Sequence, residues 1–188
     1  AGGEAETQHG VSHARQFPQH YGRRIVGAAI ISSAAEGVSR SPLGEILHNP
    51  ALEAVRFAAR YAPRLVHRTR GATRSMLRPI LRTASFGDET ISRSVVAFNE
   101  AMIHDTPIDT LVAFLHALEV HDETAALPVL ARIPTLVACG DRDLLTPVKH
   151  SEEMAAALPG SLLVIVPGAA HLVQMERPEV INEALVRL

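Results

Sequence analysis

Two short apolar runs in the last third of the chain constrain its fold more than any other feature. The first covers residues 134–139 (PTLVAC) and the second residues 161–166 (SLLVIV), and a turn containing glycine follows each. Continuous apolar runs of this length predict strands buried on both faces, as in a parallel sheet, at residues 135–139 and 162–166. Helices are predicted between the two runs, at residues 148–157, and after them, at residues 178–188. This alternation predicts parallel strands joined by right-handed crossovers.

An aspartate and a histidine follow the two runs. Asp143 lies in the turn after the first run and His171 in the turn after the second. Loops at the carboxyl ends of parallel strands share one edge of the sheet, so the two side chains are expected there together. A buried carboxylate that accepts from one imidazole nitrogen fixes the tautomer and frees the other nitrogen to take a proton. The pair predicts two members of a nucleophile–histidine–acid triad. The alternatives are that Asp143 caps the helix starting near Thr146 and that His171 is an ordinary turn histidine.

The rest of the chain divides into three regions. Residues 1–14 are polar, follow neither helical nor strand periodicity, and are expected to form an irregular leader. Residues 15–22 are expected to be a helix end with its exit turn, and residues 25–31 a third buried strand. Residues 41–118 suggest successive helices divided by prolines. Amphipathic helices are predicted there at residues 91–98 and 111–118.

The order of these elements resembles the α/β-hydrolase fold with a helical cap. The stretches IPTLVACGDRDLLTP and LPGSLLVIVPGAAHLVQMERPEVINEAL carry the resemblance, which runs from about residue 15 to residue 188. It implies an α/β fold that is the C-terminal portion of such a hydrolase, with about three parallel strands, flanking helices and a cap insertion. The implied divisions are an irregular leader at 1–14, a first core part at 15–40, a helical cap at 41–110 and a C-terminal core part at 111–188.

The resemblance also implies roles for particular residues. Asp143 matches the family's triad acid, and His171 matches its catalytic base. Asp141 is the second candidate for the acid, and Glu36, which follows the first predicted strand, is the third. Asp122 matches a position that family members often fill with aspartate, and a structural role is expected for it.

The nucleophile of the triad is not evident. The resemblance implies a strand–elbow–helix unit, often Gly-x-Ser-x-Gly, ahead of residue 15. The string GVSHA at residues 10–14 is similar, but no apolar strand precedes Ser12, which is therefore expected to be a serine of the leader. The simplest interpretation is that the chain is the C-terminal part of a longer hydrolase.

The leading functional hypothesis is a hydrolase that acts on a small or medium apolar ester-like substrate. His171 would be its base and Asp143 would orient that base. A serine nucleophile would imply an esterase, a lipase, a thioesterase, or one of the related cofactor-free haloperoxidases and carbon–carbon hydrolases. An aspartate nucleophile would imply an epoxide hydrolase or dehalogenase. The alternative is a non-catalytic remnant or interaction fragment of such a hydrolase. The unpaired edge of residues 25–31 predicts self-association or pairing with a missing N-terminal half.

Other classes of site find little support in the sequence. There is no glycine-rich phosphate loop and no cysteine pair, and the histidines near residues 104–121 match no ligand spacing, so no cofactor or metal is expected. With no tryptophan and few other aromatic residues, nucleic acid is not an expected partner. No run approaches the ~20 apolar residues of a membrane span, and no secretory signal is visible, which gives a cytoplasmic location by default.

Arginines crowd one segment of the predicted cap. Eight of them lie from Arg56 to Arg82, and no acidic residue occurs between Glu53 and Asp88. Spacing by four places many of them on one helix face. A solvated face is the favoured interpretation, and attraction of an anionic substrate or an anionic membrane surface is the alternative.

Overall fold

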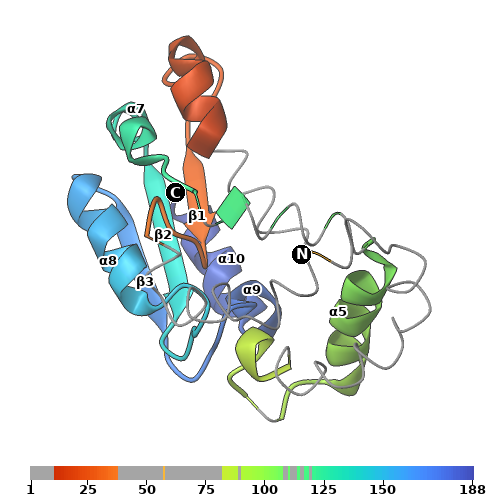
Figure 1. The fold of residues 1–188 in the computed structure, drawn as a ribbon. Coiled ribbons are helices and arrows are strands. Elements are labelled where there is room, and N and C mark those ends of the chain that lie inside the picture. The colour runs from red at the N-terminus through yellow and green to blue at the C-terminus, as the bar shows by residue number, and fades with distance from the viewer. Residues whose placement is uncertain are drawn as a thin grey trace.

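Three parallel strands form one sheet in the described part of the chain (Figure 1). A computed structural model gives the fold and describes residues 11–37, 57, 82–88, 90–107, 110, 114, 117–118 and 120–188. The strands are β1 (Ala28–Ile31), β2 (Thr135–Gly140) and β3 (Leu162–Val166), in the order β1-β2-β3. Ile30 pairs with Val137, and Ala138 pairs with Val164. The expected α/β fold with three parallel strands is confirmed.

The strand at the first sheet edge differs most from its prediction. It begins at Ala28 and not at residue 25, because residues 21–25 form a turn of their own. In that turn, the Gly22 N–H donates to the Ile25 carbonyl at 2.8 Å. The expectation of burial on both faces is also wrong for β1, where Ile30 alone is buried, and for β3, where Val166 alone is buried. Every residue of β2 is buried, because a strand flanks it on each side and helices pack on both of its faces.

Helices cover both faces of the sheet. On one face, α8 (Val148–Ala157) and a helical segment at residues 11–16 pack over Ile30 and Val137. On the other face, α9 (Val173–Glu176) and α10 (Pro178–Val186) pack over the alternate side chains of the strands. These alternate side chains include Leu136, Ala138, Val164 and Val166. The result is three layers, in which opposite faces of each strand contact different helices.

The remaining described elements lie before β2 in the chain. α5 (Arg93–Asp105) stands apart from the sheet in Figure 1, and the Ser92 side chain caps its first turn by accepting from the Ser94 N–H. Phe86 and Val96 pack on Leu172, which joins this region to the core. The helix predicted at residues 91–98 is therefore present, although it starts and ends later. The short elements are η1 (Pro18–His20), η3 (Thr124–Ala126) and α7 (Leu127–Leu130).

Residues 11–16 require a correction to the predicted leader. They are helical, and both Val11 and Ala14 are buried in the core. Their spacing of three places them on one helix face, which packs against the sheet. The irregular segment predicted for residues 1–14 is thus wrong for its last four residues, and residues 1–10 lie outside the described part. Most of the predicted cap at residues 41–110 also lies outside it, including the arginines from Arg56 to Arg78, and so does much of the helix predicted at residues 111–118.

Candidate active site

The turns after β2 and β3 bring Asp143 and His171 into contact. The Nδ1 atom of His171 lies 2.9 Å from the Oδ2 atom of Asp143. Each residue is only 4% exposed, although both belong to turns. An Nδ1–H that donates to a carboxylate leaves Nε2 as the proton acceptor of the neutral ring.

The Asp143 carboxylate is held from several directions. Its Oδ1 atom accepts from the Leu145 N–H at 2.8 Å and the Thr146 N–H at 2.9 Å. Its Oδ2 atom, which faces His171, also accepts from the Thr146 hydroxyl at 2.9 Å. These bonds fix the carboxylate within its own turn. They do not cap α8, which begins at Val148 after the N-cap residue Pro147 and has no side-chain capping bond. The alternative that Asp143 caps this helix is therefore wrong.

The two turns touch because Gly140 has no side chain. A Cβ atom at this position would overlap the backbone of Ala169, and also that of Ala170. The Arg142 N–H donates to the Ala169 carbonyl at 2.9 Å, and the Asp141 N–H donates to the Val166 carbonyl at 3.1 Å. A glycine is required where two backbones approach this closely. This close approach places the acid and the histidine within hydrogen-bond distance.

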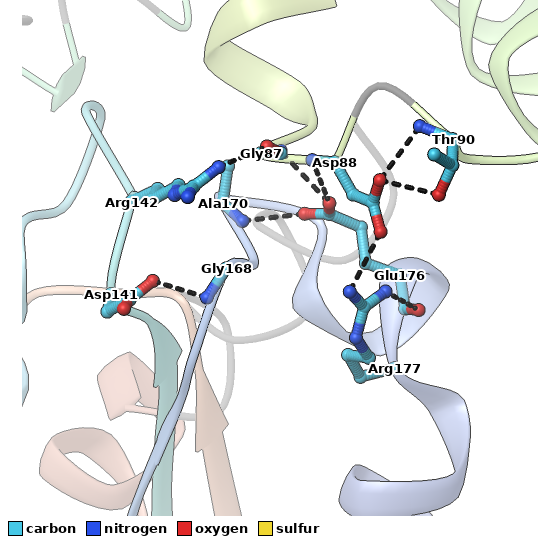
Figure 2. Close-up of polar contacts among 9 residues, drawn as sticks. All are labelled: Gly87, Asp88, Thr90, Asp141, Arg142, Gly168, Ala170, Glu176 and Arg177. Atoms are coloured by element: carbon cyan, nitrogen blue, oxygen red, sulfur yellow. Dashed lines mark hydrogen bonds and ion pairs between the residues drawn. The ribbon is translucent and has the colours of Figure 1, made fainter.

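The other candidate acids have different partners. The exposed Asp141 accepts from the Gly168 N–H at 2.7 Å, which ties one turn to the other (Figure 2). Glu36 is exposed and forms an isolated backbone bridge with Asp122. The hydroxyl and the N–H of Thr124 both donate to Asp122 and hold the pKa of its carboxyl below the ordinary value. These bonds fit the structural role expected of Asp122.

Ser12 is bound to a different carboxylate. Its hydroxyl donates to Glu123 at 2.6 Å, and Arg15 forms an ion pair with the same carboxylate at 2.7 Å. The Arg15 bond, with a smaller contribution from Ser12, lowers the pKa of Glu123. The helical segment of residues 11–16 lies at the amino end of β1, whereas Asp143 and His171 follow the carboxyl ends of their strands (Figure 1). The Ser12 hydroxyl thus donates to Glu123 and not to His171, the proposed base.

Two neighbours of the pair were not anticipated from the sequence. Thr146 donates to Asp143, and Glu176 accepts from the backbone N–H of Ala170, next to His171. A threonine three residues after an aspartate in a turn is a recognisable signal, because aspartate bonds to the backbone just ahead of it. The signal for Glu176 is a single acid in the mostly apolar stretch that follows His171.

The described residues offer no built site for a metal ion. Among them, no group of three or more histidine, cysteine, aspartate or glutamate side chains could hold one. His121 contacts the Ala34 carbonyl at 3.0 Å. Burial raises the pKa of Cys139, which disfavours the reactive thiolate. No helix in the part of the chain that the structure describes is long and apolar enough to cross a membrane.

Comparison with protein families identifies the class. Residues 48–178 match the alpha/beta hydrolase fold family. The chain belongs to this family, and the resemblance predicted from the sequence is confirmed.

Relatives with known sequences match over part of the chain. RutD of Pseudomonas syringae, a proposed carbamate hydrolase, is 33% identical over 85 residues, which cover 45% of this chain and 32% of RutD. BpoC of Mycobacterium tuberculosis, a proposed non-heme bromoperoxidase, is 34% identical over 89 residues, which cover 46% of this chain and 34% of BpoC. The matched segment thus spans about a third of each relative.

Solved structures share the fold over nearly the whole chain. The enol-lactonase of Burkholderia xenovorans superimposes with a TM-score of 0.72 at 20% identity, covering 98% of this chain and 62% of the lactonase. A thermophilic esterase of Thermogutta terrifontis gives a TM-score of 0.68 at 23% identity, covering 98% of this chain and 61% of the esterase. At these identities the likeness establishes the fold alone.

Proposed function

We propose that this chain carries the acid and base of a hydrolase that acts on a small or medium apolar ester-like substrate. The observation that carries the proposal is the 2.9 Å contact between His171 Nδ1 and Asp143 Oδ2. It lies at the carboxyl ends of the strands, where sheets of this type place their active sites.

The proposed chemistry follows from the orientation of the ring. Nδ1 donates to Asp143, so Nε2 accepts the proton of a nucleophile or a water, and His171 becomes an imidazolium. The negative charge of Asp143 stabilises that imidazolium without itself taking the proton. His171 then returns the proton to the leaving group, as a general acid. Because both side chains are buried, water weakens their interaction little.

The ester-like substrate class rests on the relatives. An esterase and an enol-lactonase share the fold, and RutD is a proposed carbamate hydrolase. Hydrolysis of esters, lactones and carbamates begins with attack on a carbonyl carbon, and such an attack needs a base like His171. The half-exposed Leu144, next to Asp143, offers apolar surface beside the acid.

The contacts favour an enzyme over a non-catalytic remnant. Two backbone N–H groups, one hydroxyl and the imidazole all satisfy the buried Asp143 carboxylate. Burial requires such partners for any carboxylate, but the imidazole is the one partner that can also act as a base. The complete set therefore supports a working acid–base pair.

The test is ester hydrolysis by the product of the full open reading frame that encodes this chain. The wild type, His171→Ala and His20→Ala would be assayed with 4-nitrophenyl acetate and 4-nitrophenyl butyrate. His171→Ala is expected to lower kcat/KM by about 1,000-fold or more. His20 lies on η1 and is the matched control, expected to retain the wild-type rate. A folded wild type that cleaves neither ester would contradict the proposed function. A fully active His171→Ala variant would contradict the assignment of the base.

A further inference from the structure

A second buried carboxylate lies beside the histidine turn. Glu176, the last residue of α9, is 6% exposed. Its Oε1 atom accepts from the Ala170 N–H at 2.6 Å. Its Oε2 atom accepts from the Gly87 N–H at 2.9 Å and from the Asp88 N–H at 3.0 Å (Figure 2). Three backbone donors therefore converge on one side chain.

These donors belong to two segments that are distant in the sequence. Ala170 directly precedes His171, whereas Gly87 and Asp88 belong to the segment that leads into α5. The Glu176 carboxylate is the point where the two segments are joined, as Figure 2 shows.

Further contacts hold residues 85–88 against the turn that carries His171. The Leu172 N–H donates to the Ser85 carbonyl at 2.9 Å, and Arg142 donates to the Gly87 carbonyl at 3.0 Å. A Cβ atom at Gly87 would lie 2.7 Å from the Gly168 carbonyl oxygen. Residues 85–88 therefore lie directly against the histidine turn.

An ion pair secures the same junction from the outside. Asp88 pairs with Arg177 at 2.8 Å and accepts from the Thr90 hydroxyl at 2.6 Å. The Thr90 bonds and the Arg177 guanidinium hold the pKa of Asp88 well below its ordinary value. Because Arg177 follows Glu176 in the chain, neighbouring residues bind both the backbone and the side chain of Asp88.

We propose that Glu176 is a positioning residue for His171 and that it couples the position of residues 87–88 to the geometry of the acid–base pair. The proposal rests on the proposed function of His171. By fixing the backbone at Ala170, Glu176 sets the backbone position of His171, and hence the direction from which the His171 ring approaches Asp143. A shift of residues 87–88 would pull on the same carboxylate and disturb the ring.

A carboxylate suits this position better than an amide does. Both oxygens accept from N–H groups, and neither faces an acceptor within the contacts described. A glutamine side chain has one oxygen and one NH₂ group, and the NH₂ group can only donate. In either orientation of the amide, its NH₂ group would face a backbone N–H. Glu176→Gln therefore loses at least one bond with almost no change in volume.

The experiment uses the protein produced from the full reading frame, labelled with ¹⁵N. The variants are Glu176→Gln and, as the matched control, Glu179→Gln, an exposed glutamate in the first turn of α10. The readouts are the NMR signals and pH titration of the His171 ring, together with kcat and KM for 4-nitrophenyl butyrate. Glu176→Gln is expected to shift the ring titration and to lower kcat by about tenfold at unchanged KM. Glu179→Gln is expected to change neither.

Asp88→Ala is the second variant, in case Glu176→Gln does not fold. It removes the ion pair with Arg177 and leaves the histidine turn itself intact. A smaller shift of the same ring titration is expected. If the ring signals and titration stay at their wild-type values in the folded variants, Glu176 is structural only and the proposal is wrong. Since the ring is observed directly, this outcome is distinct from a failure of the proposed hydrolase activity.

Discussion

At the scale of single residues, the acid of the candidate site is oriented by two neighbours that bond to the same oxygen. The Oδ2 atom of Asp143 accepts from both Thr146 and His171, and the Thr146 hydroxyl lies 3.5 Å from His171 Nδ1. The hydroxyl therefore helps to fix the carboxylate in the orientation that the histidine requires.

Removing that hydroxyl should weaken catalysis more than folding. Thr146→Val keeps the shape of the side chain and removes its bond to Asp143, so we expect kcat/KM to fall by roughly tenfold. Thr124→Val is the matched control, because Thr124 donates in the same way to Asp122. Steady-state kinetics with 4-nitrophenyl butyrate would measure both. Equal losses in the two variants would contradict a specific role for Thr146.

Glu123 gives the fold a pH dependence whose sign follows from its bonds. Hydrogen bonds from Arg15 and then Ser12 hold the pKa of Glu123 below its ordinary value of 4.5. A carboxyl whose pKa is lower in the folded state stabilises the fold above its unfolded pKa. That stability is lost as the pH falls through the folded pKa. We expect the free energy of unfolding to decline as the pH falls below about 4.5.

Glu123→Gln should make that decline shallower. The measurement is urea unfolding at a series of pH values between about 3 and 7. Glu152→Gln, an exposed glutamate of α8, is the control and should keep the wild-type slope. A Glu123→Gln variant with the wild-type slope would exclude the carboxylate as a source of the dependence.

Local patterns predicted some site residues and not others. Asp143 and His171 were predictable because each follows an apolar run that ends at the same sheet edge. The sequence marks Glu176 only as a single acid in an apolar stretch, and its contacts were not predictable, because its donors at Gly87 and Asp88 lie almost half the chain away. Only the tertiary packing of those segments brings the donors and the acceptor together.

At the scale of elements, the close contact between the turns after β2 and β3 depends on Gly140. Gly140→Ala would force the end of β2 away from the turn that carries His171, because the new methyl group overlaps the Ala169 carbonyl. We expect a loss of stability of roughly 1–3 kcal/mol, with a fall in activity because the acid and histidine separate.

The matched control for that substitution is Gly27→Ala. There the nearest atom to a new Cβ would be the flexible end of Leu188, at 3.5 Å. Denaturant unfolding of both variants would compare the two losses in the free energy of unfolding. A Gly140→Ala variant as stable as Gly27→Ala would mean that the turns can separate freely, and it would contradict the role assigned to Gly140.

The limits of an element were predicted most accurately where proline and glycine lie at both of its ends. Proline and glycine bound α8 and β3, whose observed limits equal the predicted ones. β1 was predicted too long because the apolar residues at its start belong to the turn of residues 21–25. The helical residues 11–14 were missed because two buried apolar residues, Val11 and Ala14, give too weak a periodic signal.

At the scale of the whole molecule, the outer edge of β1 is the main question. Within the described residues, β1 pairs with β2 alone. The N–H groups of Ala28 and Ser32 donate to the carbonyls of Pro134 and Ala138, on the β2 side of the strand. Because successive N–H groups of a strand point to opposite sides, the N–H of Ala29 points away from β2. An open edge of this kind is a template for pairing with another chain.

We therefore expect the 188-residue chain, produced alone, to self-associate through β1. Ala29→Pro should reduce that association, because it removes an outward donor and leaves the ladder to β2 intact. Ala28→Pro is the contrasting variant, since it breaks the bond to the Pro134 carbonyl and should destabilise the fold. Light scattering after size-exclusion chromatography measures the association of the two variants, and urea unfolding measures their stability. A chain that remains monomeric at all concentrations would contradict the prediction.

The central claim is that Asp143 orients His171 as a base, and one comparison of two neighbouring aspartates tests it most directly. In Asp143→Asn, an amide NH₂ facing Nδ1 would favour the tautomer that protonates Nε2, which then cannot accept a proton. In Asp141→Asn, the amide oxygen can still accept from the Gly168 N–H. The measurement is kcat/KM of both variants for 4-nitrophenyl butyrate. We predict a loss of about 10⁴-fold in Asp143→Asn and the wild-type value in Asp141→Asn. An active Asp143→Asn variant, or an equal loss in Asp141→Asn, would contradict the claim.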